Sequence, residues 1–170
     1  NFKTKLEPID IRTMDLKKRL PRPGSVDVVV GSPPCTQFSF ANRGGSGDIA
    51  DGLRDVERFL AVVRYLKPKY WVMENVPRVK SILEREFQIG GQLIKYKDLC
   101  KQIEVINIAD YGLPQSRKRM FAGDFPLDLL KCYKNRCAQL TLGQIISSLD
   151  RNKVNDPIWG MVLQKTEVTD

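Results

Sequence analysis

The sequence reads VDVVVGSPPCTQFS over residues 26–39. Its first five residues form a short β-branched run bounded by Pro-Gly and Gly-Ser-Pro-Pro, which is typical of a buried strand in a parallel sheet. Pro33 and Pro34 then fix φ at two consecutive positions and hold the backbone extended as far as Cys35. Because ligands in such sheets bind beyond the carboxyl ends of the strands, Cys35 is a candidate reactive thiol rather than a small buried hydrophobe.

Outward from this strand, apolar residues alternate between helical and strand spacing. The segments with helical patterns are residues 53–66, residues from the turn at 76–77 to about 87, and residues 141–149 with Thr141 as N-cap. The segments with strand patterns are residues 70–73, 103–108 and 120–122. Glycines and polar residues in 41–52 indicate a loop. The alternation predicts an α/β fold with a largely parallel sheet and flanking helices.

The composition excludes several kinds of chemistry. The chain has 170 residues, about one domain, and its 28 Lys and Arg against 20 Asp and Glu leave a formal net charge of +8. It has no histidine, which rules out a Ser-His-Asp triad, a Cys-His dyad or a His-ligated metal within it. Its four cysteines lack the spacing of a zinc site, and no apolar run approaches the ~20 residues that span a bilayer. We therefore expect no metal and no membrane partner, while the positive charge points weakly to a polyanion.

Two further groups of polar residues lie next to predicted strands. Glu74 and Asn75 follow the strand at 70–73, where a carboxylate is costly unless other groups satisfy it. Arg117 and Arg119 alternate just before the strand at 120–122, so both side chains are expected to face one side. Since Cys35 and Glu74 both end strands of one sheet, we expect them at the same edge.

Three motifs occur in order: GSPPCTQFS at 31–39, ENV at 74–76 and QSRKR at 115–119. Together they resemble the Pro-Cys, Glu-Asn-Val and Gln-x-Arg-x-Arg motifs of the DNA cytosine-5 methyltransferases. The resemblance covers about residues 10–150 and implies a Rossmann-like, S-adenosylmethionine-dependent methyltransferase sheet that is incomplete at both ends. Residues 1–150 would be the catalytic core and residues 151–170 the start of the target-recognition region. Thr36-Gln37 departs from the Gln-Gly or Gln-Ala that commonly follows the cysteine in this family.

The resemblance implies a reaction, namely methyl transfer from S-adenosylmethionine to C5 of a cytosine flipped out of duplex DNA. Cys35 is similar to the nucleophile that adds to C6 of the base, and Glu74 to the carboxyl group that contacts N3 and the N4 amino group. Arg119 matches the arginine that contacts O2, and Arg117 its neighbour near the nucleophile. We expect the protein to act on DNA as a monomer.

Other positions are assigned by the same resemblance. On the substrate side, Pro33 would offer its carbonyl to N4 and Ser39 would contact a phosphate. The remaining substrate-side residues are Asn75 and Gln115. On the cofactor side, Asp10 and Ile11 would meet the adenine, and Pro34 would lie beside the cofactor. The Phe-x-Gly-x-Gly cofactor loop of the family has no counterpart, so we expect the 170 residues alone to bind cofactor poorly.

Three alternatives stay open on the sequence. A tRNA cytosine-5 methyltransferase shares the fold and the motifs but would act on folded RNA. A catalytically idle nucleic-acid-binding module would keep the motifs only as scaffold, and replacing Cys35 would then change nothing but affinity. A thiol protein would use Cys132 and Cys137, which lie in KCYKNRC, and one of them would be unusually acidic.

Overall fold

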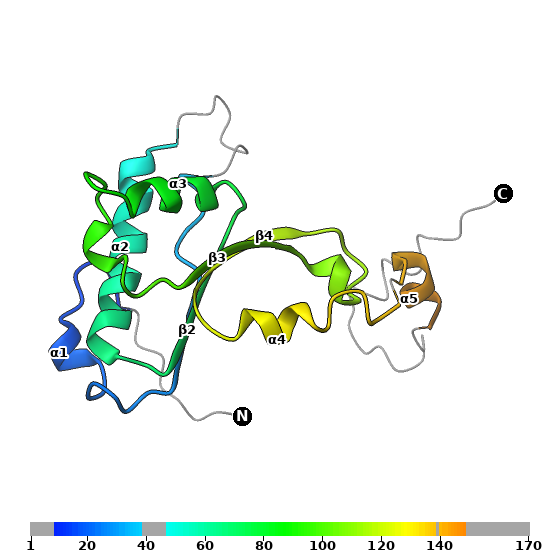
Figure 1. The fold of residues 1–170 in the computed structure, drawn as a ribbon, viewed down its shortest axis with the longest axis horizontal. Helices are drawn as coiled ribbons and strands as arrows, with labels where there is room; N and C mark the ends of the chain where they lie inside the picture. Colours follow the sequence, from blue (N-terminus) through cyan, green and yellow to red (C-terminus); the bar gives the residue numbers. More distant parts are fainter. Residues whose placement is uncertain (1–8, 39–46, 139, 149–170) are drawn as a thin grey trace.

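A computed structural model of the chain describes residues 9–38, 47–138 and 140–148. Figure 1 shows strands in the middle of the molecule, helices α2 and α3 beside them, and the α5 region at the far end of the long axis. The helices are α1 (Leu16–Arg19), α2 (Ile49–Leu66), α3 (Val79–Glu86), α4 (Leu127–Lys131) and α5 (Leu142–Ser148), with the 3₁₀ turns η1 (Ile94–Tyr96) and η2 (Ile108–Tyr111). The strands are β1 (Val28–Gly31), β2 (Tyr70–Asn75), β3 (Gln102–Asn107) and β4 (Lys118–Asp124).

The four strands form one sheet in the order β1-β2-β4-β3. β1 and β2 pair in parallel, whereas β4 is antiparallel to both of its neighbours, so β1, β2 and β3 all run in the same direction. Helix α2 supplies the crossover that a parallel pair needs. Residues 108–117, which begin with the turn η2, connect β3 to β4, and a connection without a crossover helix suits an antiparallel pair. The predicted α/β fold with a largely parallel sheet is confirmed, with β4 as the strand that runs the other way.

Helix α2 carries the core that supports the sheet. The Asp48 side chain accepts a hydrogen bond from the Asp51 amide at 3.0 Å and caps the helix, which therefore begins at Ile49, inside the segment expected to be a loop. Lys67, in the left-handed conformation at φ 50°, ends it. Its buried face packs with β2, α3 and β4 in a single core, whose largest fully buried side chains include Leu60, Met73 and Met120.

The predicted buried strand at 26–30 is exposed on one face. Val28 and Val30 are 53% and 71% exposed, and only Val29 packs against the core. The reason is position, because β1 is an edge strand and pairs only with β2 among the described residues. A β-branched run indicates a strand, but it does not reveal whether both faces of that strand are covered.

The remaining predicted elements are found close to their expected bounds. The N-cap at Thr141 is confirmed, because its hydroxyl accepts from the Gln144 amide at 3.2 Å and the Gln144 side chain accepts from the Thr141 amide at 2.8 Å. Strand β2 is two residues longer than predicted, since β4 pairs with Glu74 and Asn75. Within the described part of the chain, no helix is long and apolar enough to cross a membrane. The segment 151–170 lies outside the described residues.

Candidate active site

The three motifs meet at one edge of the sheet. β1 ends at Gly31, which is in register with Met73 of β2, and Asn75 of β2 is in register with Met120 of β4. Because β1 and β2 are parallel and β4 runs against them, the ends of the first two strands lie beside the start of β4. The sheet register therefore brings the Pro-Pro-Cys, Glu-Asn and Arg-containing segments together, as the sequence predicted for Cys35 and Glu74.

The Glu74 carboxylate is held from both sides. Arg119 Nε lies 2.8 Å from Glu74 Oε1, and the Ser32 hydroxyl donates to Glu74 Oε2 at 2.7 Å. The Glu74 and Arg119 side chains are only 30% and 22% exposed, so the pair is more shielded than an ordinary surface ion pair. Sequence reasoning missed Ser32, although continuing the parallel register one step beyond Gly31 and Met73 places Ser32 opposite Glu74.

Asn75 fixes the backbone that leads to Cys35. Its Nδ2 donates to the Pro33 carbonyl at 3.0 Å, and its Oδ1 accepts from the Val76 amide at 2.9 Å. The side chain is 1% exposed. Because both polar ends are satisfied inside the protein, Asn75 ties the strand β2 to the Pro-Pro segment after β1.

Cys35 itself is exposed and free, and its thiol lies between two anchored segments. On one side the Pro33 carbonyl is bound to Asn75; on the other, the Phe38 amide donates to the Cys35 carbonyl at 2.9 Å and the Phe38 ring is fully buried. Gly52 of α2 makes room for this ring, because a Cβ atom there would lie 2.6 Å from the Phe38 Cζ. Cys35 therefore sits on a short, anchored turn with its side chain open to solvent.

The other substrate-side candidates are not all brought to this place. Arg117 and Gln115 are exposed and precede β4, and in the described residues no hydrogen bond or ion pair joins either side chain to Cys35 or Glu74. Arg119 lies on β4, and Arg117 directly precedes the strand, with its carbonyl accepting from the Ile108 amide at 3.1 Å. That both arginine side chains face one side stays a prediction. Ser39 lies outside the described residues.

A hollow of about 290 Å³ lies next to the Pro-Pro segment. It is lined by Ile11, Val29, Val30, Gly31, Ser32, Pro33, Pro34, Asp55, Phe59 and Val62. The cofactor candidates Ile11 and Pro34 thus share one hollow, whereas Asp10 is not part of its lining and accepts from the Arg12 amide at 2.8 Å. The apolar lining suits a flat ring such as adenine, and the volume is near the lower limit for a ligand pocket, so it fits part of a cofactor of this size.

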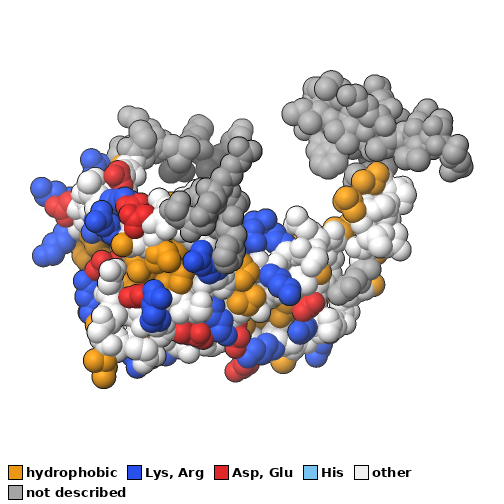
Figure 2. Space-filling view, turned by 90° about the horizontal axis from the view of Figure 1, so that it is seen from above, with side chains coloured by type: hydrophobic (Ala, Val, Ile, Leu, Met, Phe, Trp, Pro, Cys, Tyr) orange, Lys and Arg blue, Asp and Glu red, His pale blue; other side chains and the backbone are white. Residues whose placement is uncertain are grey.

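In the described part of the chain, the remaining cysteines and carboxylates form no metal site. Among the described residues, no group of three or more Cys, Asp or Glu side chains could hold a metal ion. Cys132 and Cys137 are exposed free thiols, while burial raises the pKa of Cys100 to about 11. Figure 2 shows Lys and Arg side chains dispersed over the visible face and interleaved with Asp and Glu. The net positive charge is therefore not gathered into one patch on that face.

Comparison with known proteins places this arrangement in a family. The family model for the C-5 cytosine-specific DNA methylase matches residues 1–157. The type II methyltransferase M.XorII of Xanthomonas oryzae pv. oryzae is 31% identical over 144 residues, which cover 79% of this chain and 32% of the relative. DNA (cytosine-5)-methyltransferase 3 of Zea mays is 37% identical over 117 residues, which cover 62% of this chain and 12% of the relative.

Among solved structures, the Entamoeba histolytica methyltransferase EhMeth superposes with a TM-score of 0.48 and 20% identity, over 74% of this chain and 40% of that one. The chain spans about a third or less of the length of the two curated relatives above. Because the family model covers nearly all of the chain, the chain belongs to the C-5 cytosine-specific DNA methylase family.

Proposed function

We propose that the protein transfers a methyl group from S-adenosylmethionine to C5 of a cytosine in duplex DNA, and that Cys35 is the nucleophile. Membership of the family supports the reaction class, and the names of the relatives support DNA as the substrate. The observation that carries the proposal is the Glu74 carboxylate, which is held between Ser32 and Arg119. Ser32 lies three residues before Cys35, whose thiol is exposed. S-adenosylmethionine supplies an electrophilic methyl group when it is bound.

The chemistry needs a nucleophile because cytosine C5 is itself weakly nucleophilic. The Cys35 thiolate forms an S–C6 bond, and the electron pair of the C5=C6 bond becomes available at C5 to take the methyl group. The electron pair of the former sulfur–methyl bond would stay on the sulfur of the demethylated cofactor. A base would then remove the C5 proton, the C5–H electron pair would re-form the C5=C6 bond, and the S–C6 bond would break with its electron pair returning to the Cys35 thiolate. With no histidine in the chain, the acid–base groups for these steps are carboxylates, other side chains or water.

Glu74 has capacity left for the base. Its Oε2 accepts one hydrogen bond from Ser32 and its Oε1 forms an ion pair with Arg119, whereas a carboxylate has about four acceptor sites. The N4 amino group of cytosine could therefore donate to Glu74 without displacing either partner. Protonation of Glu74 would let it donate to N3 as negative charge moves onto the ring. Arg119, already fixed by Glu74, would be directed at O2.

Pro33 and Asn75 contribute through the backbone. The Pro33 carbonyl uses one of its two lone pairs on Asn75 Nδ2, which leaves the other for the cytosine amino group. Asn75 is too buried to touch DNA in this structure, so any effect of it on substrate passes through Pro33. Arg117, Gln115 and Ser39 are proposed to contact DNA around the flipped base.

On the cofactor side, Ile11 and Pro34 would pack against the adenine in the hollow beside Cys35. Asp10 lies next to Ile11 in the chain, outside the lining, and would reach the adenine amino group from the rim. These residues bind and orient, and the apolar lining keeps water away from one side of the hollow.

The test is methyl transfer by the full-length protein from radiolabelled S-adenosylmethionine. Duplex DNA and tRNA are offered in parallel, and Cys35→Ala is compared with Cys132→Ala, a control that removes another exposed thiol. We expect 5-methylcytosine in DNA from the wild type and from Cys132→Ala, and none from Cys35→Ala. Label in tRNA alone would move the substrate to RNA, and label that survives Cys35→Ala would contradict the assigned nucleophile.

A further inference from the structure

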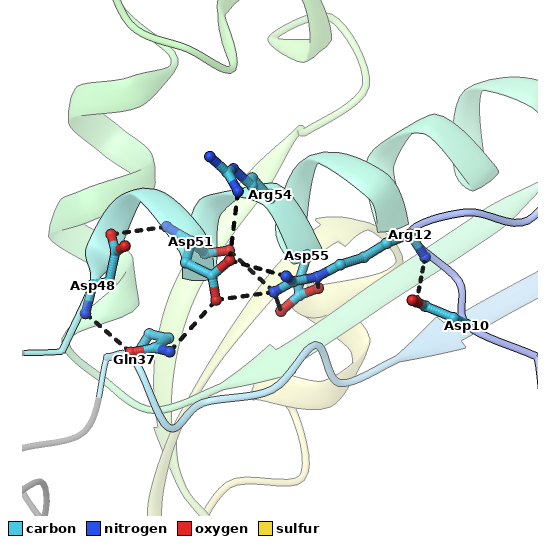
Figure 3. A network of polar contacts seen from close by, with 7 residues as sticks. All are labelled: Asp10, Arg12, Gln37, Asp48, Asp51, Arg54 and Asp55. Carbon is cyan, nitrogen blue, oxygen red and sulfur yellow. Dashed lines mark hydrogen bonds and ion pairs between the residues drawn. The ribbon is translucent and has the colours of Figure 1, made fainter.

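A cluster of charged and polar side chains joins the first turns of α2 to two segments that come from elsewhere in the chain (Figure 3). The members are Asp10, Arg12, Gln37, Asp48, Asp51, Arg54 and Asp55. One of the joined segments carries the cofactor candidates Asp10 and Ile11. The other is the turn directly after Cys35. The cluster therefore lies between the two halves of the proposed site. Apart from Asp10, the proposed function assigns no role to its members.

Arg12 binds two carboxylates of α2, those of Asp51 and Asp55. Its Nε and Nη2 lie 2.5 and 2.8 Å from the two oxygens of Asp55, and its Nη1 and Nη2 lie 2.9 and 3.1 Å from the two oxygens of Asp51. The planar guanidinium is suited to such paired contacts, which a lysine cannot reproduce. Asp55 is 9% exposed, so without Arg12 it would be a nearly buried carboxylate with no cation in contact.

The contacts between Arg12 and Asp51 favour the charged forms of both side chains. The hydrogen bonds that Arg12 donates to Asp55 and to Asp51 raise the pKa of Arg12 above its ordinary value, and the same bonds to Asp51 lower the pKa of that carboxyl group. Arg12 and Asp51 are thus both held in their charged forms.

Helix α2 also reaches back to the same segment. Arg58 Nε donates to the Ile11 carbonyl at 2.5 Å, and Arg58 Nη2 donates to the Met14 carbonyl. Arg12 reaches from the segment to the helix, and Arg58 reaches from the helix to the segment. This reciprocal arrangement fixes the backbone of Ile11, whose side chain lines the hollow beside Cys35.

The same carboxylate of Asp51 faces the turn after the nucleophile. Gln37 Nε2 lies 3.5 Å from Asp51 Oδ2, and Gln37 Oε1 accepts from the Asp48 amide at 3.0 Å. A glycine or alanine at position 37 could not reach α2, so this contact depends on the glutamine side chain. Gln37 is two residues beyond Cys35, so Asp51 touches both the nucleophile turn and, through Arg12, the cofactor segment.

We propose that Arg12, Asp51 and Gln37 form a positioning bridge that holds the cofactor segment and the Cys35 turn in one fixed arrangement. The inference rests on the proposed function, because it takes Ile11 as a cofactor contact and Cys35 as the nucleophile. Arg12 is a positioning residue and touches neither substrate nor cofactor. Its loss removes one of the two ties between the Ile11 segment and α2, leaving only those of Arg58, and leaves the Asp51 carboxylate beside the Cys35 turn with only the more distant Arg54 as a cation.

The experiment measures both ends of the bridge in the full-length protein. Calorimetry gives the affinity for S-adenosylmethionine, and mass spectrometry of the Cys35 peptide gives its rate of alkylation by iodoacetamide in the absence of cofactor. The variants are Arg12→Lys, which keeps the charge beside Asp55, Arg12→Gln, and the control Arg54→Gln. Arg54 also pairs with Asp51, at 3.9 Å, but its side chain is 73% exposed and belongs to α2 itself.

We expect both Arg12 variants to weaken cofactor binding by about tenfold or more, a loss of the size seen when residues that orient metal ligands are replaced. They should also change the Cys35 alkylation rate, raise the KM for S-adenosylmethionine, and leave the KM for DNA within about twofold. Gln37→Ala should change the alkylation rate alone. Arg54→Gln should leave all of these within about twofold.

Failure of the positioning bridge can be distinguished from failure of the proposed function. If Arg12→Lys melts at the wild-type temperature and keeps wild-type cofactor affinity and alkylation rate, the bridge is overturned while the proposed function stands. An equal effect of Arg54→Gln would overturn it too, because the result would then report only the loss of one charge. If the wild type binds no S-adenosylmethionine, the proposed function fails and the bridge fails with it.

Discussion

Replacing Asn75 tests whether this side chain holds the approach to Cys35. The change Asn75→Ala removes the donor to the Pro33 carbonyl and the acceptor for the Val76 amide, at 3.0 and 2.9 Å. Each partner left unsatisfied in a buried place costs about 1–3 kcal/mol, and some of that cost is recovered if water enters. We therefore expect the free energy of unfolding to fall by about 2–4 kcal/mol, a large part of the ~5–15 kcal/mol that stabilises a typical domain.

Two further variants, Asn75→Asp and Asn107→Ala, test the same prediction. Asn75→Asp keeps the shape and the acceptor for Val76 but places an oxygen against the Pro33 carbonyl, so it should destabilise the protein at least as much as Asn75→Ala. Asn107→Ala is a matched control, because Asn107 also ends a strand and accepts from a backbone amide, that of Ala109 at 3.4 Å, but it is not fully buried. This control should cost about 1 kcal/mol or less.

The assay is urea denaturation of the three variants beside the wild type, with the midpoint and slope fitted separately. The same samples are then tested for the alkylation rate of Cys35, which should change in both Asn75 variants as the Pro33–Cys35 backbone loosens. If Asn75→Asp unfolds within about 0.5 kcal/mol of wild type, the Asn75–Pro33 hydrogen bond does not hold this segment and the reasoning is refuted.

Three further predictions concern Cys100, Glu86 and Gly52. Burial raises the pKa of Cys100 to about 11, so at pH 8 iodoacetamide should modify Cys35 at least about a hundredfold faster, as mass spectrometry of the two peptides would show. Hydrogen bonds from a backbone amide and an arginine lower the pKa of Glu86 below its ordinary value, so Glu86→Gln should lower the urea midpoint at pH 7 and this deficit should vanish as the pH falls through the lowered pKa. A side chain at residue 52 would clash with Phe38 at 2.6 Å, so Gly52→Ala should destabilise the protein by about 1 kcal/mol despite its higher helix propensity, and a higher midpoint would contradict the close contact.

The sign for Glu86 follows from its depressed pKa in the folded state. The carboxylate stabilises the fold fully above the pKa that it has in the unfolded chain. That contribution is lost as the pH falls through the lower, folded value, because the proton then binds equally to both states.

Local patterns were enough to predict the elements but not their surroundings. The β-branched run before Gly31 and the helical spacing after Leu53 predicted β1 and α2, since each depends on neighbours a few residues away. The exposure of Val30 did not follow, because it depends on which strand lies at the edge of the sheet. The last two residues of β2 were missed for the same reason, as their partner β4 is some 45 residues away in the chain.

The candidate site likewise contains residues that local motifs predict and contacts that they do not. Cys35, Glu74 and Arg119 could be predicted because each lies in a recognisable motif next to a strand. Ser32 could have been found by extending the parallel register, whereas the contacts of Arg12 join residues 39 and 43 positions apart and have no local signature. Long-range ion pairs of this kind are set by the packing of α2 on the preceding segment, which the order of residues alone does not show.

The central claim is that Cys35 forms a bond with cytosine C6 during methyl transfer. Duplex DNA of randomised sequence with 5-fluorocytosine at a fixed place tests it directly, because fluorine cannot leave C5 as a proton does and the S–C6 bond then persists. In the presence of S-adenosylmethionine, the full-length protein should form a denaturant-resistant complex with this DNA, with the DNA attached to the Cys35 peptide and no complex from Cys35→Ala. A complex mapped to another residue, or 5-methylcytosine formed on ordinary DNA by Cys35→Ala at the wild-type rate, would contradict the account.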